Sequence, residues 1–230
     1  MYAAALLPAI ILGIYIWRKD PHPEPFIWAL RAFLLGVLIC MPVAFLENWV
    51  NGLIFGGGEP HTLFGSTVKA FFVAAIPEEG AKLLALWLLL RNNKQFDEHF
   101  DGIVYAVFIS LGFAAIENVG YVLMAGEAWM STAIVRALLA VPGHYAFAIL
   151  MGYYYALYHF VDKSKRNAWF MFLMPVLAHG VYDALAMSGS VNPLVGGISF
   201  IVLVYFCIKL QKAAQAKVLD LIAKNNSSIF

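Results

Sequence analysis

Charged residues are scarce in this chain. Asp, Glu, Lys and Arg make up 13% of its 230 residues, whereas 62% are hydrophobic. Soluble domains carry about twice that share of charge, which they need to cover their surface. The composition therefore excludes a water-soluble globule and predicts an all-α, polytopic membrane protein.

Basic surface and cysteine are scarce as well. The net charge is +1, too small for the basic stripe with which proteins bind nucleic acid. Cys40 and Cys207 are the only cysteines, and each lies in an apolar run. A disulfide framework and a thiolate metal site are thus excluded. The expected surroundings are the lipid bilayer, with no nucleic-acid partner.

Seven apolar runs predict about seven transmembrane helices. They cover residues 2–17, 26–46, 63–90, 102–125, 132–158, 168–187 and 194–209. Lys and Arg gather in alternate connections, which predicts an outside N-terminus and a cytoplasmic C-terminus. We expect a single domain, 1–230, made of an N-terminal anchor helix at 1–17, a helix bundle with the active site at 26–209, and a cytoplasmic tail at 210–230.

Six ionisable residues stand out inside these runs, where a charge costs at least about 2.5 kcal/mol. They are Glu78, Glu79, Glu117, His144, His179 and Asp183. Because such residues mark functional sites in membranes, we expect them to meet in one buried polar chamber. Arg31, Lys69 and Arg136 lie near span ends, and their side chains are expected to reach for the membrane surface.

The third run, 63–90, is too long for a straight span, and Pro77 marks the expected break. Glu78 and Glu79 then stand in the first turn of a new half-helix, whose free amide groups favour anions. Lys82 is close enough along the helix to pair with either glutamate. One glutamate is thus expected to be paired and the other free, without the sequence saying which.

His179 and Asp183 are four residues apart and share one helical face. This spacing suits a histidine oriented by an acid, and it equally suits two ligands of one metal ion. If a metal is bound, we expect zinc, with the glutamate pair activating its water. The expected ligands are then Glu117, His144, His179 and Asp183.

Buried carboxylates and imidazoles near helix prolines can supply a general base, an oxyanion donor and a positioned water. We therefore predict peptide hydrolysis inside the membrane. Glu78 takes a proton from the attacking water, and His179, held by Asp183, donates to the developing oxyanion. Glu117 and His144 share protons or position the water.

Two other classes of function remain open. Carboxylates on broken helices are also how proton- or cation-coupled transporters bind their ions. A non-catalytic scaffold would instead bind a partner span through small residues such as Gly112 and Gly120.

Five short motifs follow one another along the chain, and the last four of them hold the six residues. They are DPHPEP (Asp20 to Pro25), PEEGAK (Pro77 to Lys82), GFAAIEN (Gly112 to Asn118), VPGH (Val141 to His144) and AHGVYD (Ala178 to Asp183). Together they resemble the motifs of the PrsW family of intramembrane proteases, over residues 18–187.

The resemblance implies cleavage of single-pass membrane proteins, such as anti-sigma factors, in a bacterial plasma membrane. It also implies kinship with the CAAX prenyl proteases, in which a glutamate is the base and a His-x-x-x-Asn pair forms the oxyanion site. This chain has Glu117 and Asp183 where that relative has a His and an Asn. The resemblance therefore leaves metal dependence open.

Overall fold

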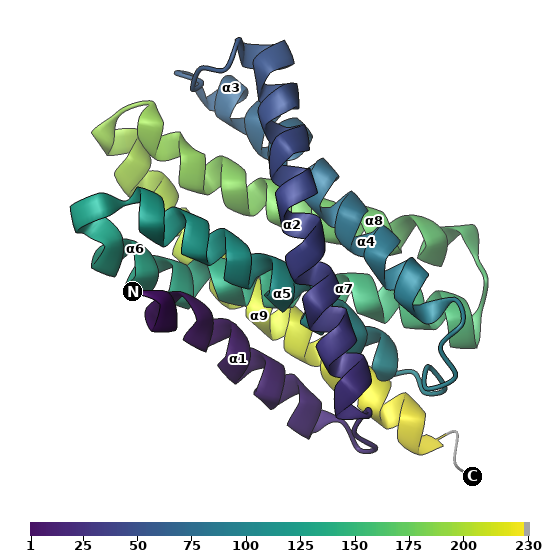
Figure 1. The fold of residues 1–230 in the computed structure, drawn as a ribbon. Coiled ribbons are helices and arrows are strands. Elements are labelled where there is room, and N and C mark those ends of the chain that lie inside the picture. Colours follow the sequence, from purple (N-terminus) through teal and green to yellow (C-terminus); the bar gives the residue numbers. More distant parts are fainter. Residues whose placement is uncertain (228–230) are drawn as a thin grey trace.

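The computed structural model describes residues 1–227, which fold into a bundle of long helices without any strand (Figure 1). Its elements are α1 (Tyr2–Lys19), α2 (Phe26–Phe55), α3 (Leu63–Val68), η1 (Lys69–Ala75), α4 (Ile76–Leu90), α5 (Asp101–Met124), η2 (Gly126–Ala128), α6 (Trp129–Val135), η3 (Arg136–Ala140), α7 (Val141–Ala156), η4 (Leu157–Val161), α8 (Lys165–Met187), η5 (Ser188–Ser190) and α9 (Pro193–Ser227). Since α3, η1 and α4 form one continuous helix and η2 to η4 another, the described residues make seven long helices.

Six helical segments are long and apolar enough to cross a membrane. They cover 2–19, 26–55, 101–124, 126–161, 165–190 and 193–225. The seventh expected span, 63–90, forms the continuous helix of α3, η1 and α4. It is not among the six apolar segments, and it carries the charged residues Lys69, Glu78, Glu79 and Lys82. The prediction of an all-α protein with many membrane-spanning helices is confirmed.

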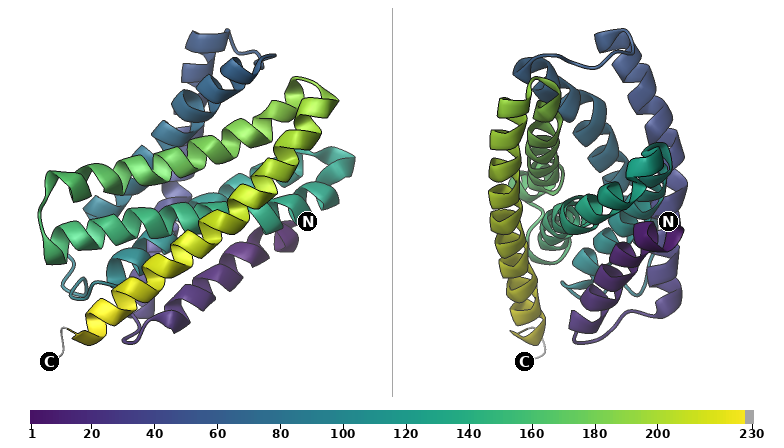
Figure 2. Two further views of the ribbon diagram at one scale, coloured as in Figure 1. Left: turned by 180° about the vertical axis from the view of Figure 1, so that it is seen from behind. Right: turned by 90° about the vertical axis from the view of Figure 1, so that its left-hand side faces the viewer.

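Helices α5 and α7 lie at the centre, and α2 crosses α5 on one side (Figures 1 and 2). The crossing is backbone against backbone. A Cβ added at Gly36 would collide with the carbonyl of Ile109, and one added at Gly112 with the carbonyl of Phe33. Only glycine allows this approach. Gly112 therefore packs inside the bundle rather than against a partner span.

Two π-helical segments, η1 and η3, end two residues before Pro77 and Pro142. A π turn widens the helix, which makes room where the proline ring would otherwise strike the carbonyl of the preceding turn. The amide of Ile76 still bonds to the carbonyl of Phe71. The expected break at Pro77 is therefore wrong, and Glu78 and Glu79 lie in a continuous helix without a free N-terminus.

Two helices run further than the sequence suggests. Helix α2 continues past residue 46 to Phe55, where Gly56 adopts a left-handed conformation with φ of 62°. Residues 210–227 of the expected tail continue α9 without interruption, while 228–230 lie outside the described residues.

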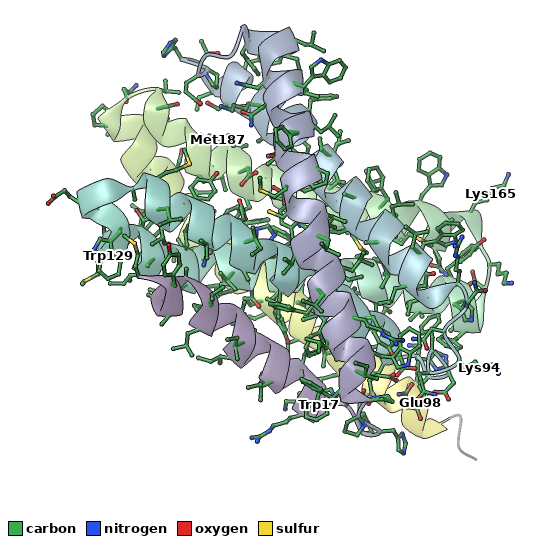
Figure 3. All side chains as sticks on the ribbon, viewed as in Figure 1. Trp17, Lys94, Glu98, Trp129, Lys165 and Met187 are labelled. Carbon is green, nitrogen blue, oxygen red and sulfur yellow. The ribbon has the colours of Figure 1, made fainter. Side chains whose placement is uncertain are left out.

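The connections rich in Lys and Arg lie at one end of the helix bundle. Figure 3 shows Lys94, Glu98 and Lys165 at this end together with Trp17, whereas Trp129 and Met187 mark the other end. The first of these is the end that the charge pattern assigns to the cytoplasm.

Candidate active site

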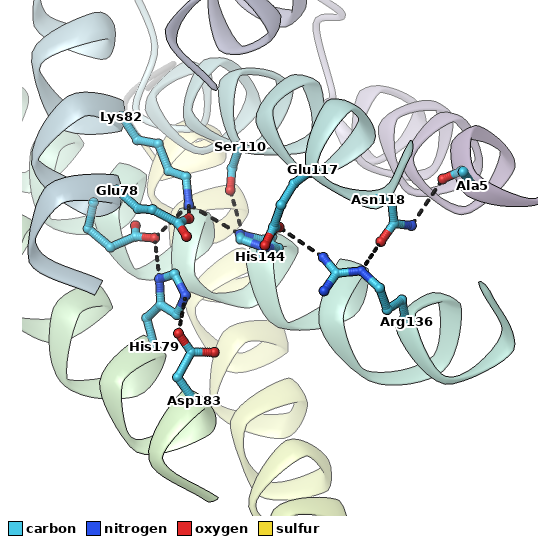
Figure 4. A network of polar contacts seen from close by, with 11 residues as sticks. Ala5, Glu78, Lys82, Ser110, Glu117, Asn118, Arg136, His144, His179 and Asp183 are labelled. Atoms are coloured by element: carbon cyan, nitrogen blue, oxygen red, sulfur yellow. Dashed lines mark hydrogen bonds and ion pairs between the residues drawn. The ribbon is translucent and has the colours of Figure 1, made fainter. Parts of the chain in front are cut away.

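The six residues expected in a polar chamber join one network in the middle of the bundle (Figure 4). Lys82 is its hub, with only 1% of its side chain exposed. Its Nζ donates to Oε2 of Glu78 and to Oε1 of Glu79, each at 2.8 Å. The same Nζ lies 3.2 Å from Nδ1 of His144. Because an ammonium has only donors, Nδ1 of His144 accepts and Nε2 carries the hydrogen.

Glu117 closes the network on the side of α6 and α7. Its Oε2 lies 2.9 Å from Nε2 of His144 and 2.9 Å from Nη2 of Arg136. Arg136 also donates through Nε to Asn118, whose amide donates in turn to the carbonyl of Ala5 in α1 at 3.0 Å. The expectation that Arg136 reaches for the membrane surface is wrong, because the half-buried carboxylate of Glu117 lies within its reach.

His179 has a carboxylate at each ring nitrogen. Nε2 lies 3.3 Å from Oδ2 of Asp183, the partner expected from their spacing along α8. Nδ1 is closer to a second partner, Oε1 of Glu79, at 2.9 Å. The ring stacks on Phe147 with its centroid 4.8 Å away, which fixes its plane. Glu79 is thus the nearer orienting group, and no local spacing reveals it.

A cavity of about 590 Å³ reaches this network. Five of the six residues line it, namely Glu78, Glu117, His144, His179 and Asp183. Glu79 and Lys82 do not, and lie buried behind them. The cavity also extends to Gly57 and Glu59, so it leads toward the connection between α2 and α3.

Glu47 of α2 lines the same cavity, although the sequence does not predict it as a site residue. Its Oε1 is buried and has no hydrogen-bond partner among residues 1–227. The apolar run was expected to end at residue 46, so Glu47 was placed outside the span. The continuation of α2 to Phe55 brings it to the site.

Comparison with known proteins agrees with the geometry. Residues 24–210 match the model of a family described as "PrsW family intramembrane metalloprotease". The chain belongs to this PrsW family. Curated proteins named Protease PrsW match as well. The one from Geobacillus kaustophilus is 36% identical over 192 residues, 82% of this chain and 80% of its own length. The one from Bacillus subtilis is 33% identical over 218 residues, 94% of each chain.

Membership in the PrsW family establishes the coarse function. The chain is an intramembrane protease embedded in the bilayer. The transporter and the scaffold are thereby set aside. No solved structure matches the chain, so the arrangement of the candidate site rests on the geometry above.

The family description speaks of a metal, and the donor positions allow a test of fit. Ligand atoms of Glu78, Glu79 and His144 lie within 4.8 Å of one another, which is close enough to share an ion. The ammonium of Lys82 already contacts all three. A metal ion there would stand beside this positive charge, which repels it strongly in a buried site. With Lys82 in place, these residues do not fit a metal.

The ligand set expected from the sequence forms two pairs. Glu117 contacts His144, and Asp183 contacts His179. The two imidazole rings are neighbours, with centroids 5.4 Å apart. Each imidazole thus already has a carboxylate of its own.

Proposed function

We propose that this PrsW protease cleaves single-pass membrane proteins, such as anti-sigma factors, by glutamate-activated water in a bacterial plasma membrane. The relatives it matches come from bacteria. The cavity that reaches the polar network supports water access, since it leads from the α2–α3 connection to Glu78 and the two histidines. A substrate helix entering from the bilayer would meet water there.

Glu78 is the general base in this proposal. It is the member of the glutamate pair that lines the cavity, and this observation carries the proposal. Lys82 holds its Oε2, so Oε1 remains for a water molecule. Glu79 has no exposed surface and donors at Oε1, so it acts through its neighbours.

The chemical steps follow from these positions. Oε1 of Glu78 takes a proton from water as the water oxygen attacks the substrate carbonyl carbon. The carbonyl electron pair moves to the oxygen, which His179 stabilises through an N–H group. Glu78 then returns the proton to the amide nitrogen, the carbon–nitrogen bond breaks, and an amine and a carboxyl group leave.

His179 donates from Nε2 in this scheme. Glu79 holds Nδ1 at 2.9 Å, whereas Asp183 lies 3.3 Å from Nε2. The substrate oxygen takes the place of Asp183 at Nε2, because that contact is the longer one. Glu79 and Asp183 are thus positioning residues that keep both ring nitrogens protonated.

His144 and Glu117 position the water on the opposite wall. The Nε2 hydrogen of His144 points at Glu117, whose charge is balanced by Arg136. Both side chains line the cavity. A water molecule between Glu117 and Glu78 would be oriented by carboxylate acceptors on two sides.

Reconstitution in liposomes tests the proposal. The purified chain and a tagged single-span anti-sigma factor are mixed, and cleavage is followed by gel. Glu78→Gln should lower the rate by about 10²- to 10⁴-fold, the usual contribution of a general base. Glu127→Gln is the matched control, since Glu127 is exposed on η2 at the far end of α5. Undiminished cleavage by Glu78→Gln would overturn the proposal.

A metal-dependent version is the second candidate, favoured by the family description and by the donor types of Glu78, Glu79 and His144. It requires Lys82 to leave its place. Chelation followed by zinc decides between the two. Cleavage that persists in chelator supports the glutamate mechanism, whereas loss in chelator and recovery with zinc supports the metal.

A further inference from the structure

A second buried cluster of carboxylates lies far from the protease site. Asp20 and Glu24 belong to the connection between α1 and α2, and Asp101 begins α5. Asp101 precedes Glu117 by 16 residues of one helix, which is about 24 Å. The mechanism uses none of the three. The cluster lies at the end of the bundle that holds Trp17, Lys94 and Glu98 (Figure 3).

The three carboxylates are buried together with no cation to balance them. Asp20 and Glu24 are each 5% exposed and Asp101 is 1% exposed. One oxygen from each lies within 4.8 Å of the others. Within residues 1–227, no ion pair joins any of them to a Lys or Arg; His22, the nearest basic group in the connection, pairs with Glu98 at 2.8 Å. Burying this much like charge is costly without a counter-ion.

Two oxygens in the cluster have no partner among the described residues. They are Oδ2 of Asp20 and Oδ1 of Asp101, and both atoms are buried. The other oxygens are held by the fold. Oδ1 of Asp20 accepts from the amide of His22, and Oδ2 of Asp101 accepts from the amides of Asp97 and Glu98. Asp20 and Asp101 are thus each fixed by one oxygen, and the second oxygen of each is left without a hydrogen-bond donor.

Glu24 completes the set from the opposite side. Its carboxyl group contacts that of Asp101, and its Oε2 accepts from the hydroxyl of Tyr105. Its backbone carbonyl accepts from Nε1 of Trp17 at 2.9 Å. The orientation of Glu24 is therefore set before any ligand arrives.

We propose that Asp20, Glu24 and Asp101 bind a hard divalent cation, Mg²⁺ or Ca²⁺, which fastens the α1–α2 connection to the first turn of α5. All the donors are carboxylate oxygens, the type that these ions prefer over the softer metals. The charge pattern assigns this end to the cytoplasm, where Mg²⁺ is available. The proposal is independent of the protease mechanism.

Terbium luminescence tests the site in the full-length protein. Tb³⁺ is an oxygen-seeking stand-in for these ions, and Tyr105 and Trp17 are close enough to Glu24 to sensitise its emission. We expect saturable emission that excess Mg²⁺ or Ca²⁺ displaces. Asp20→Asn and Asp101→Asn should each weaken binding by roughly 10- to 100-fold. Glu127→Gln and Glu78→Gln should leave it unchanged. Emission that both cluster variants retain would overturn the proposal.

Thermal unfolding of the wild type provides a second measurement that needs no variant to fold. A cation that binds the folded state raises the midpoint as its concentration rises. We expect Mg²⁺ or Ca²⁺ to raise the midpoint over that in chelator, and Asp101→Asn to lose this increase. A midpoint that is the same with and without cation would show that the carboxyl groups share protons instead, and would overturn the proposal.

Discussion

Glu79 and His179 are 100 residues apart in sequence and in direct contact, with Oε1 of Glu79 lying 2.9 Å from Nδ1 of His179. The same oxygen receives Lys82 at 2.8 Å, while Oε2 has no partner within the described residues. One carboxylate oxygen thus holds both the cation beside the proposed base and the proposed oxyanion donor. Glu79 joins the two halves of the site without touching the cavity.

Glu79→Gln tests this role. The amide keeps the shape but removes the charge that fixes His179, so we expect the turnover number to fall by about 10²- to 10⁴-fold. The Michaelis constant should change little, because Glu79 does not line the cavity. Cleavage assays over a range of substrate concentrations separate the two constants. A rise in the Michaelis constant at normal turnover would instead place Glu79 in substrate binding.

Lys82→Met tests the hub of the network. Without the ammonium, Glu78 and Glu79 lose the counter-ion that they share, and only Glu79 keeps a contact to His179, so we expect a loss of about 3–5 kcal/mol of stability. Adding Glu79→Gln should recover part of this loss, because one of the two charges that Lys82 balanced is then absent. Denaturation of the two single variants and the double variant measures the coupling. Strictly additive losses would contradict a shared network.

The meeting of the six ionisable residues could be predicted from the sequence because lipid penalises each of them separately. Contacts within one helix were equally accessible, since Lys82 follows Glu78 by four residues and Asp183 follows His179 by four. Contacts between helices were not. The link from Glu79 to His179 depends on how α4 and α8 pack, which no local period encodes.

Helix extent was the other source of error. Glu47 was missed because charged and polar residues after residue 46 suggested the end of a span, although α2 continues. The prediction of a helix break at Pro77 was wrong for a related reason. Proline predicts a break only when the surrounding turns keep α-helical spacing, and η1 does not.

Gly112→Ala tests the crossing of α2 and α5. An added methyl group collides with the backbone of Phe33, and we expect a loss of about 1–3 kcal/mol as the helices move apart. Gly52→Ala is the matched control on α2, because a Cβ there meets nothing within 4 Å. It should be neutral or stabilise by up to about 1 kcal/mol. Equal midpoints of thermal unfolding for the two variants would contradict the crossing.

Asp20 predicts a pH dependence that a cation suppresses. Burial raises its pKa from 3.8 to about 7, helped by the charges of Glu24 and Glu98, although the amide of His22 lowers it. Asp101 faces it in the same cluster. Between pH 3.8 and about pH 7, Asp20 holds a proton in the folded protein that it releases in the unfolded chain. The stability of the fold therefore falls as the pH rises through this range.

Unfolding midpoints at about pH 5 and about pH 8 check this sign. In chelator, the wild type should be less stable at the higher pH, and Asp20→Asn should reduce that difference. A bound divalent cation replaces the proton, so saturating Mg²⁺ should raise the midpoint more at the higher pH. An equal effect of Mg²⁺ at both values would argue against competition between cation and proton.

The π-helical turns before Pro77 and Pro142 set the direction of the side chains in the candidate site. A π segment shifts the phase of every side chain after it relative to a regular helix, and removing one residue from 69–75 would rotate the following turns by about 100°. Glu78 and Glu79 would then face away from His144 and His179, although every motif would still be spelled in full. The proposed mechanism thus depends on helical phase as well as on residue identity.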